Sequence, residues 1–191
     1  IRQDVNISIL DGKVVEVKGV QRLDLLEKII NFEALRQKSL IHLKDELTNR
    51  GLTPKDFQHK PIDITSLFQK NNDTILKKTF KKGMKIYAIK LKKFSGILSL
   101  EEFPGTRFGR ELADVARFYG LGGLLDSDEI PGHGVTPLEV KKVRSKLHLD
   151  ESDGFLLLSG EKGKLEKASE AIQKRVQSTF NGVPAETRGP T

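Results

Sequence analysis

The 191-residue sequence contains no cysteine and no tryptophan. The absence of cysteine excludes disulfide bonds, thiolate zinc sites, iron–sulfur clusters and cysteine nucleophiles, and it is typical of a cytoplasmic protein. Long apolar runs are missing too, since stretches such as residues 155–158 are far shorter than the roughly 20 residues of a membrane helix. No basic and then apolar leader opens the sequence, and it does not begin with methionine. We therefore expect an internal piece of a cytoplasmic protein, with no membrane contact.

The familiar catalytic and nucleotide-binding motifs are also missing. The glycines of residues 105–123 do not form the GxGxxG pattern of a dinucleotide site, and no glycine-rich loop ends in the Gly-Lys-Ser/Thr of a P-loop. No serine stands in the context of a nucleophile elbow. The four histidines are too far apart in the sequence to form a recognisable ligand pair: His42, His59, His133 and His148. We expect no metal site from these residues.

Positive charge, in contrast, is abundant and clustered. The formal net charge is +7, and residues 74–100 contain no acidic side chain. The same stretch carries eight lysines: Lys77, Lys78, Lys81, Lys82, Lys85, Lys90, Lys92 and Lys93. A run of cations without carboxylates attracts polyanions such as nucleic acid, whereas evenly scattered lysines only solvate a surface. These lysines are predicted RNA contacts, and an ordinary solvated face is the alternative.

The first residues predict a β-hairpin, because apolar and polar side chains alternate on both sides of an Asp-Gly turn signal. The apolar positions are Val5, Ile7, Ile9, Val15 and Val17. We expect a three-residue loop, residues 11–13, in which the glycine takes a positive φ. In that register Asn6 lies opposite Lys18, and Ser8 lies opposite Glu16. A two-residue loop would instead mix polar and apolar side chains on each face.

The polar face of this hairpin combines cations, carboxylates and an amide. Its members are Arg2, Asp4, Asn6, Glu16 and Lys18. Such a set can hold phosphate and a magnesium ion. A solvent face with cross-strand ion pairs is the alternative reading of the same spacing.

The period then changes to that of a helix, from Leu23 to Arg50, with Gly51 as its cap. The apolar stripe of this helix is Leu25, Ile29, Phe32, Leu40, Leu43 and Leu47. At about 40 Å, the helix is long enough to connect two domains. Residues 51–83 predict a polar connector that ends in a short helix from Asp73.

Residues 84–183 alternate between strands and helices, which predicts a two-layer α/β sandwich within an α+β protein. Strands are expected at 84–91, 123–125 and 155–158, and helices at 107–119, 136–147 and 164–180. Arg107, Arg110 and Arg117 share one edge of the first of these helices. They can grip phosphates through forked hydrogen bonds, or they can pair with Asp114 and Glu111; the sequence leaves both open. Residues 184–191 predict a linker that packs against nothing obvious.

Two stretches together resemble a known family. IRQDVNISI followed by VVEVKGVQ is similar to the end of the catalytic cradle in the B/E family of tRNA-dependent amidotransferase subunits, and within it to the archaeal E subunits. FPGTRFGRELADVARFYGLGGLLDSDEIPGHGVT resembles the GAD insert that E subunits share with bacterial aspartyl-tRNA synthetases. GVPAETRGP resembles the family's return toward the cradle. The implied organisation is cradle end at 1–50, connector at 51–83, GAD-like insert at 84–183 and return linker at 184–191.

The resemblance implies an ATP- and magnesium-dependent ligase, which phosphorylates the γ-carboxylate of glutamate on tRNA(Gln) and then replaces the phosphate with ammonia. The ammonia would come from an asparaginase-like amidase partner, the D subunit, and the insert would contribute to tRNA binding. Six residues match the cradle pattern and would lie near the kinase site: Arg2, Asp4, Asn6, Glu16, Lys18 and Gln21. Because the earlier part of the cradle should supply most metal ligands, we expect the chain alone to be inactive.

Two other functions stay open. A stand-alone RNA-binding module, such as an aspartyl-tRNA synthetase insert, would leave RQDVNISI and VEVKGVQ unexplained. A protein-interaction scaffold would leave the lysine run without a role. An isolated hairpin has unpaired edges and is marginally stable, so we also expect a homodimer, unless the helix at 23–50 folds back over the hairpin within one chain.

Overall fold

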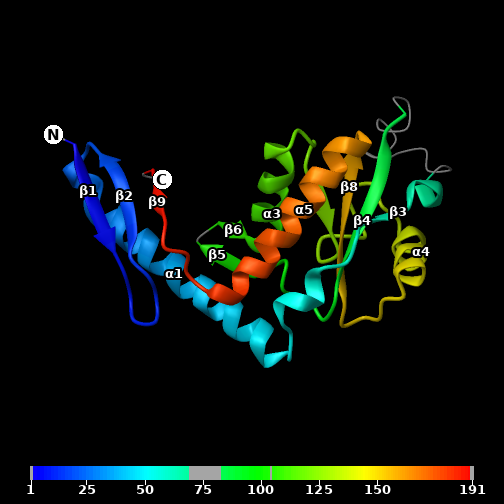
Figure 1. Ribbon diagram of the computed structural model, residues 1–191, viewed down its shortest axis with the longest axis horizontal. Coiled ribbons are helices and arrows are strands. Elements are labelled where there is room, and N and C mark those ends of the chain that lie inside the picture. The colour runs from blue at the N-terminus through cyan, green and yellow to red at the C-terminus, as the bar shows by residue number, and fades with distance from the viewer. Residues whose placement is uncertain (1, 69–82, 104, 190–191) are drawn as a thin grey trace.

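The protein is elongated, with a small sheet at one end, a larger sheet at the other and one long helix that joins them (Figure 1). The computed structural model describes three ranges, residues 2–68, 83–103 and 105–189. The helix predicted from Asp73, together with Lys77, Lys78, Lys81 and Lys82, lies outside these ranges. The described elements confirm the predicted α+β class.

The small sheet begins with the predicted hairpin. Strand β1 (Gln3–Ile7) pairs antiparallel with β2 (Val15–Val20), and Asn6 lies opposite Glu16. The predicted register, with Asn6 opposite Lys18, is therefore wrong by two residues. Because the shift is an even number, the polar side chains of both strands still share one face.

The turn between these strands is also longer than predicted, and it spans residues 8–14. Asp11, and not Gly12, takes a positive φ of 63°. Gly12 donates its N–H to the carbonyl of Ile9 at 3.0 Å, and a Cβ at this position would collide with Oε1 of Gln37. Glycine is required here for a close approach to the long helix rather than for its backbone conformation.

A third strand, β9 (Thr187–Arg188), completes the small sheet from the other end of the chain. It runs parallel to β2, with Thr187 opposite Glu16. The expectation that this segment packs against nothing is wrong, and the return implied by the family resemblance is observed.

The long helix α1 (Leu26–Asn49) follows a short 3-10 turn, η1 (Leu23–Leu25), and ends before Gly51 at a φ of 72°, as predicted. At 1.5 Å per residue it spans about 36 Å. Ile29 and Leu40 of this helix pack on the hairpin, and its last turns reach the second core through Leu43 and Leu47. The helix therefore shares its apolar stripe between two cores.

Other segments of the same chain cover the hairpin. Helix α1 buries Ile7, Val15 and Val17, and strand β9 pairs with the outer edge of β2. These contacts are the alternative to the expected homodimer, and they remove the exposed apolar face on which that expectation rested. The outer edge of β1 has no strand partner among the described residues.

The larger sheet is antiparallel and has the order β3-β4-β8-β7. Its strands are β3 (Ile62–Asp63), β4 (Lys85–Leu91), β7 (Leu124–Asp126) and β8 (Gly154–Gly160). Helices α3 (Phe108–Phe118) and α5 (Lys162–Ser178) lie on one side of the sheet, and α4 (Pro137–Leu147) lies on the other (Figure 1).

Both faces of the inner strands are buried, which the two-layer prediction did not anticipate. Tyr87 and Ile89 point into the core beneath α3 and α5, whereas Ile86 and Ala88 point into the core beneath α4. A strand that is apolar on both faces requires cover on both sides. The arrangement is therefore three layers deep where α4 packs.

The connector contributes more than its polar composition predicted. It forms η2 (Pro54–Phe57), strand β3 and η3 (Thr65–Phe68), and Phe57, Ile64 and Phe68 are almost completely buried. Two further strands, β5 (Glu101–Phe103) and β6 (Thr106–Arg107), make a small hairpin before α3, and η4 (Thr179–Asn181) follows α5.

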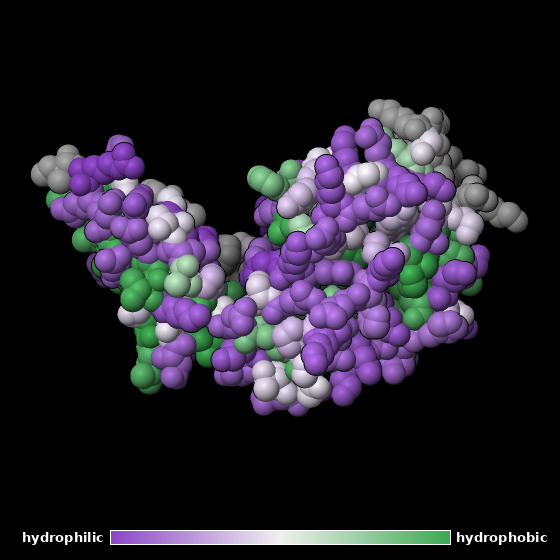
Figure 2. All heavy atoms as spheres, in the orientation of Figure 1, coloured by the Kyte–Doolittle hydropathy of each residue, from purple (hydrophilic) through white to green (hydrophobic). Residues whose placement is uncertain are grey.

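The surface differs between the two ends of the molecule. Figure 2 shows mostly hydrophilic side chains over the larger sheet and its helices, and apolar patches around the β1–β2 turn. Leu10 and Val14 in that turn are 88% and 56% exposed. Within the described ranges, no helix has both the length and the apolar character to cross a membrane.

Candidate functional site

The first candidate site is the polar face of the small sheet, opposite to α1. The Nζ of Lys18 lies 3.5 Å from Oε2 of Glu16, and the hydroxyl of Thr187 donates to the same oxygen at 3.2 Å. Asp4 accepts the N–H of Gly19 at 3.0 Å. We call this surface the hairpin face, and its members are Arg2, Asp4, Asn6, Glu16, Lys18 and Thr187.

The structure brings five of the six predicted cradle residues onto this face. Arg2 packs beside Gly19, whose ideal Cβ would lie 3.3 Å from the guanidinium. Gln21 is exposed just beyond the end of β2. Thr187 was missed, because no local pattern connects residue 187 with residue 16. The face offers two carboxylates and two cations to solvent, but no group of three acidic or histidine side chains that could hold a metal occurs among the described residues.

Beneath the hairpin face lies a buried polar network that the sequence did not predict. Arg36 is 5% exposed and donates from Nε to Glu33 at 2.9 Å and from Nη2 to Glu186 at 2.9 Å. Gln37 donates to Glu33 at 3.0 Å and to the carbonyl of Ile7 at 3.1 Å. The network ties α1 to both β1 and the segment that leads into β9, and it thereby fixes the third strand of the sheet.

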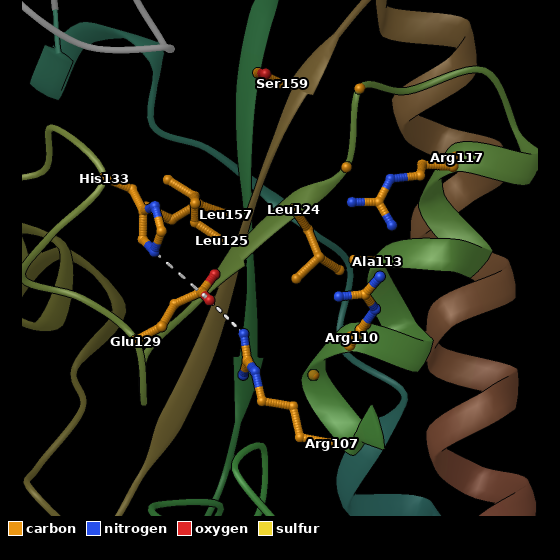
Figure 3. Close-up of a pocket in the computed structure, with 13 residues that line it drawn as sticks. Arg107, Arg110, Ala113, Arg117, Leu124, Leu125, Glu129, His133, Leu157 and Ser159 are labelled. Atoms are coloured by element: carbon orange, nitrogen blue, oxygen red, sulfur yellow. Dashed lines mark hydrogen bonds and ion pairs between the residues drawn. The ribbon is translucent and has the colours of Figure 1, made fainter. Parts of the chain in front are cut away.

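The second candidate site is a cleft of about 400 Å³ beside α3 (Figure 3). Arg110 and Arg117 enter it from α3, and Figure 3 shows His133 on the opposite side, across a wall of leucines. We call it the arginine cleft. It is lined by Arg107, Gly109, Arg110, Ala113, Arg117, Gly122, Gly123, Leu124, Leu125, Glu129, His133, Leu157 and Ser159.

The three arginines differ in whether their charge is paired with a carboxylate of the protein. Arg107 pairs with Asp126 at 2.6 Å and also with Glu129. Arg117 pairs with Asp114 at 2.5 Å. Arg110 is exposed and forms no ion pair with a described residue. The two alternatives from the sequence therefore apply to different arginines, and Arg110 is the one left for an external anion.

Glu111, the other candidate partner, pairs with Arg175 of α5 at 3.0 Å between Oε2 and Nη2, and this contact fastens two helices together.

The ion pair at the base of the cleft joins a buried carboxylate, Asp126, to a partly exposed guanidinium, Arg107. Asp126 is fully buried, and this burial raises the pKa of its carboxyl, although the hydrogen bond from Arg107 acts in the opposite direction. Burial alone would lower the pKa of Arg107, but the hydrogen bond and charge of Asp126 raise it. Arg107 thus stays charged and serves as a structural counter-ion for Asp126 and Glu129.

The described lysines of the basic run do not gather on one surface. Lys85 begins β4 and pairs with Asp63 at 3.3 Å, whereas Lys92 and Lys93 follow its last residue. Seven strand residues separate the two ends by about 23 Å. Lys90 lies between them and is half-buried. The four lysines before residue 83 are outside the described ranges, so RNA contact by the run stays a prediction.

Comparison with known proteins relates these two sites to one family. The model for the GatB/GatE catalytic domain matches residues 1–95, and the model for the GAD domain matches residues 76–169. The E subunit of the glutamyl-tRNA(Gln) amidotransferase of Methanopyrus kandleri is 43% identical over 189 residues, and those of Sulfolobus acidocaldarius and Caldivirga maquilingensis are each 47% identical over 192 and 190 residues. The chain belongs to the GatB/GatE family. Each match covers 98% of this chain, and the chain spans about 30% of the length of these curated relatives.

The two candidate sites lie in parts of the chain that are matched by different family models. The hairpin and α1 lie in the match to the catalytic domain, and the arginine cleft lies in the match to the GAD domain. The basic run lies largely where the two matches overlap, at residues 76–95. Strand β9 lies beyond both matches and still completes the sheet of the catalytic-domain part.

Gly109 is required where α3 starts beside the buried ion pair. A Cβ at this position would collide with the carboxylate of Asp126 and would lie 2.7 Å from Nη1 of Arg107. We expect Gly109→Ala to lower the free energy of unfolding by about 1–3 kcal/mol, as overpacking does, in a urea titration. Gly163→Ala in α5 is the control, because a Cβ there meets nothing within 4 Å. It should stabilise the helix slightly. Equal stability of the two variants would contradict the packing at the start of α3.

Proposed function

We propose that this chain is part of a glutamyl-tRNA(Gln) amidotransferase, a ligase that converts Glu-tRNA(Gln) to Gln-tRNA(Gln) with ATP. The observation that carries the proposal is identity of 42–47% over at least 98% of the chain to proteins named as E subunits of glutamyl-tRNA(Gln) amidotransferase. In this proposal the hairpin face borders the reacting groups, and the basic run and the arginines of α3 contact tRNA phosphates.

The proposed chemistry explains why cations are needed on the hairpin face. A carboxylate is a poor electrophile, so its oxygen first forms a bond to the terminal phosphorus of ATP. The bond from that phosphorus to the bridging oxygen breaks, and ADP leaves. Ammonia then forms a bond to the carbonyl carbon. The bond between that carbon and the phosphate oxygen breaks, and inorganic phosphate leaves with the electron pair and with the proton that the nitrogen loses. Negative charge accumulates on oxygen in both steps, and a fixed ammonium such as that of Lys18 stabilises it.

The hairpin face fits phosphate better than it fits a magnesium ion. Arg2 and Lys18 are exposed cations, and Glu16 orients Lys18 while Thr187 holds Glu16. Magnesium prefers an octahedral set of oxygen ligands, and Asp4 and Glu16 are the only two carboxylates of this face. We therefore assign no step to the metal here; ATP and magnesium remain the proposed cofactors of the parent protein.

The proposed reaction also requires partners. The ammonia would come from an asparaginase-like amidase, the D subunit, and the substrate would be tRNA(Gln) that carries glutamate, in the cytoplasm. The direct test is the amidation of Glu-tRNA(Gln) by the parent protein and its Lys18→Ala variant.

Binding of tRNA by this chain should depend steeply on salt, because the proposed contacts are to phosphates. Each phosphate contact contributes a slope of roughly −0.7 to −0.9 to log K against log salt. Reversing Lys81, Lys82 and Lys85 to glutamate should flatten the slope by about 2.1 to 2.7 if all three are contacts. Nitrocellulose filter binding at several salt concentrations measures it.

A matched control for this experiment lies on α4. Lys141 and Lys142 are exposed on α4, and their reversal to glutamate removes as much charge per residue. If both variants change the slope equally, or if neither does, the basic run is a solvated surface.

A further inference from the structure

The arginine cleft offers more donors than the protein uses. Arg110 forms no ion pair with a described residue, and Arg117, whose side chain is 52% exposed, is paired only with Asp114 among the described residues. A guanidinium carries five N–H donors, so Arg117 retains several after this contact. Arginine forks match phosphate oxygens in pairs, which makes the α3 side of the cleft suitable for one phosphate group.

An apolar wall faces these arginines. Figure 3 shows Leu124, Leu125 and Leu157 between the arginines of α3 and His133. A phosphate ion gains nothing from contact with apolar side chains. A nucleotide, in contrast, carries a phosphate on one side and a flat, weakly polar base on the other, and the base can pack on the leucines. The volume of about 400 Å³ lies at the lower end of the range for small-ligand pockets.

The far side of the cleft is polar again. His133 is 54% exposed, and its Nε2 lies 3.9 Å from Oε2 of Glu129. These side chains provide a donor and an acceptor at the position where a base edge or a ribose hydroxyl would end. A base inside a duplex has both faces stacked and its edge paired, so only an unpaired nucleotide can present these groups together.

An exposed aromatic side chain follows the arginines of the cleft in the sequence. Phe118 follows Arg117 directly, is 85% exposed and contacts Tyr119 edge-on, with 5.4 Å between ring centres. Exposed aromatic rings next to arginines are stacking surfaces for successive bases of a single strand. This ring favours a strand over a free nucleotide as the occupant.

We infer that the arginine cleft binds one unpaired nucleotide of an RNA strand, with its phosphate on Arg110 and Arg117 and its base against the leucine wall. The inference rests on the proposed role in tRNA binding and specifies which feature of an RNA this part of the chain takes. It also assigns Phe118 to the neighbouring base.

Gly122 allows a test that blocks the cleft without altering any charge. It lines the cleft, and a Cβ at this position meets nothing within 4 Å. Fluorescence anisotropy compares a short single-stranded RNA with a blunt duplex of the same sequence. We expect Gly122→Leu to weaken binding of the single strand about tenfold, the scale of one lost stacking contact, and to leave duplex binding unchanged. Lys142→Glu, a charge change on α4, should preserve the preference for the single strand.

Each other outcome counts against the inference. Unchanged single-strand binding in Gly122→Leu overturns it, and so does a nucleoside monophosphate that binds as tightly as the strand, since the cleft would then be a small-molecule site. Chemical footprinting on the unmodified chain avoids any folding defect of the variant. The single strand, but not the duplex, should protect Arg110 from phenylglyoxal; absence of protection overturns the inference.

Failure of this inference can be told apart from failure of the proposed function. The proposed function is tested by amidation and by the salt slope with tRNA, neither of which requires the cleft to be open. A cleft that takes no nucleotide in a chain whose parent amidates Glu-tRNA(Gln) refutes the inference alone. A preference for single strands in a protein without amidation activity refutes the proposed function alone.

Discussion

Replacing Lys18 by alanine in the full-length parent protein, assayed with its amidase partner, should lower the rate of Glu-tRNA(Gln) amidation by roughly 10²- to 10³-fold, the usual loss when one fixed charge-stabilising donor is removed. Affinity for tRNA should change little, because the loss acts on the transition state and not on the bound substrate. Quenched-flow amidation and equilibrium tRNA binding, measured side by side, check the two parts.

The structure makes Lys18 a clean position for this experiment. Its side chain is 49% exposed, and the ion pair with Glu16 at 3.5 Å is a surface pair of the kind that contributes about 0–1 kcal/mol to stability. A large loss of rate in Lys18→Ala therefore cannot come from unfolding. Lys13→Ala is the matched control, since Lys13 is an exposed lysine in the turn of the same hairpin.

Asp4 is the second position to change in the same experiment, and the effect of its removal is less simple to interpret. Because Asp4 accepts the N–H of Gly19, Asp4→Ala also removes a contact between the two strands. Asp4→Asn retains an acceptor and isolates the charge. If Lys18→Ala and Asp4→Asn reduce rate and affinity to the same extent, the hairpin face is structural and not part of the reaction.

Local periodicity predicted most of the elements. The 3.6-residue stripe of α1 and the buried run of β8 each depend on neighbours a few residues apart. The cap of α4 is local in the same way: Thr136 accepts the N–H of Glu139 at 3.3 Å, and the carboxylate of Glu139 accepts the N–H of Thr136 at 2.8 Å. These interactions are encoded where they act, so the sequence is sufficient to find them.

Interactions between distant segments could not be predicted in this way. Strand β9 pairs with β2 across about 170 residues, and neither strand carries a signal for the other. The same holds for Glu186, which completes the network of Arg36. Glu33 and Gln37 fit the polar side of α1 on periodicity alone, and their buried network is completed by the hairpin and by Glu186, which are distant in the sequence.

The same difference between local and distant interactions applies to the two candidate sites. The composition of the hairpin face follows from alternation, even though the register was wrong, because an even shift preserves the face. The edge of three arginines follows from helical spacing. Their partners do not, since Asp126 and Glu129 arrive from β7 and the turn after it. Sequence spacing therefore predicted which arginines share an edge but not that Arg110 alone is left without a counter-ion among the described residues.

The buried network of α1 leads to the largest expected effect on stability. Arg36→Ala leaves Glu33, which is 3% exposed, without its bidentate partner and also removes the ion pair to Glu186. Removal of one partner from a buried ion pair typically costs about 3–5 kcal/mol, because the remaining charge stays desolvated. For a chain of this size the loss corresponds to a fall in Tm of roughly 6–20 °C, measurable by calorimetry.

An exposed pair in the same part of the chain provides the control. Arg22 and Asp24 form an ion pair with side chains 68% and 61% exposed, so Arg22→Ala should cost less than about 1 kcal/mol. The double variant Glu33→Ala/Arg36→Ala should lose less than the sum of its single changes, because it leaves no unpaired charge between these positions.

The same substitution should also release β9 from the small sheet. Glu186 lies next to Thr187, and its main-chain carbonyl accepts the N–H of Glu16 at 3.1 Å. Loss of Arg36 therefore removes a side-chain ion pair that joins α1 to this segment. Amide hydrogen exchange at Thr187 and Arg188 should then accelerate before exchange in β8, which belongs to the other core. If Arg36→Ala melts as a unit with unchanged exchange at β9, or is no less stable than Arg22→Ala, the network does not fix the third strand, and Thr187 has no secure place on the hairpin face.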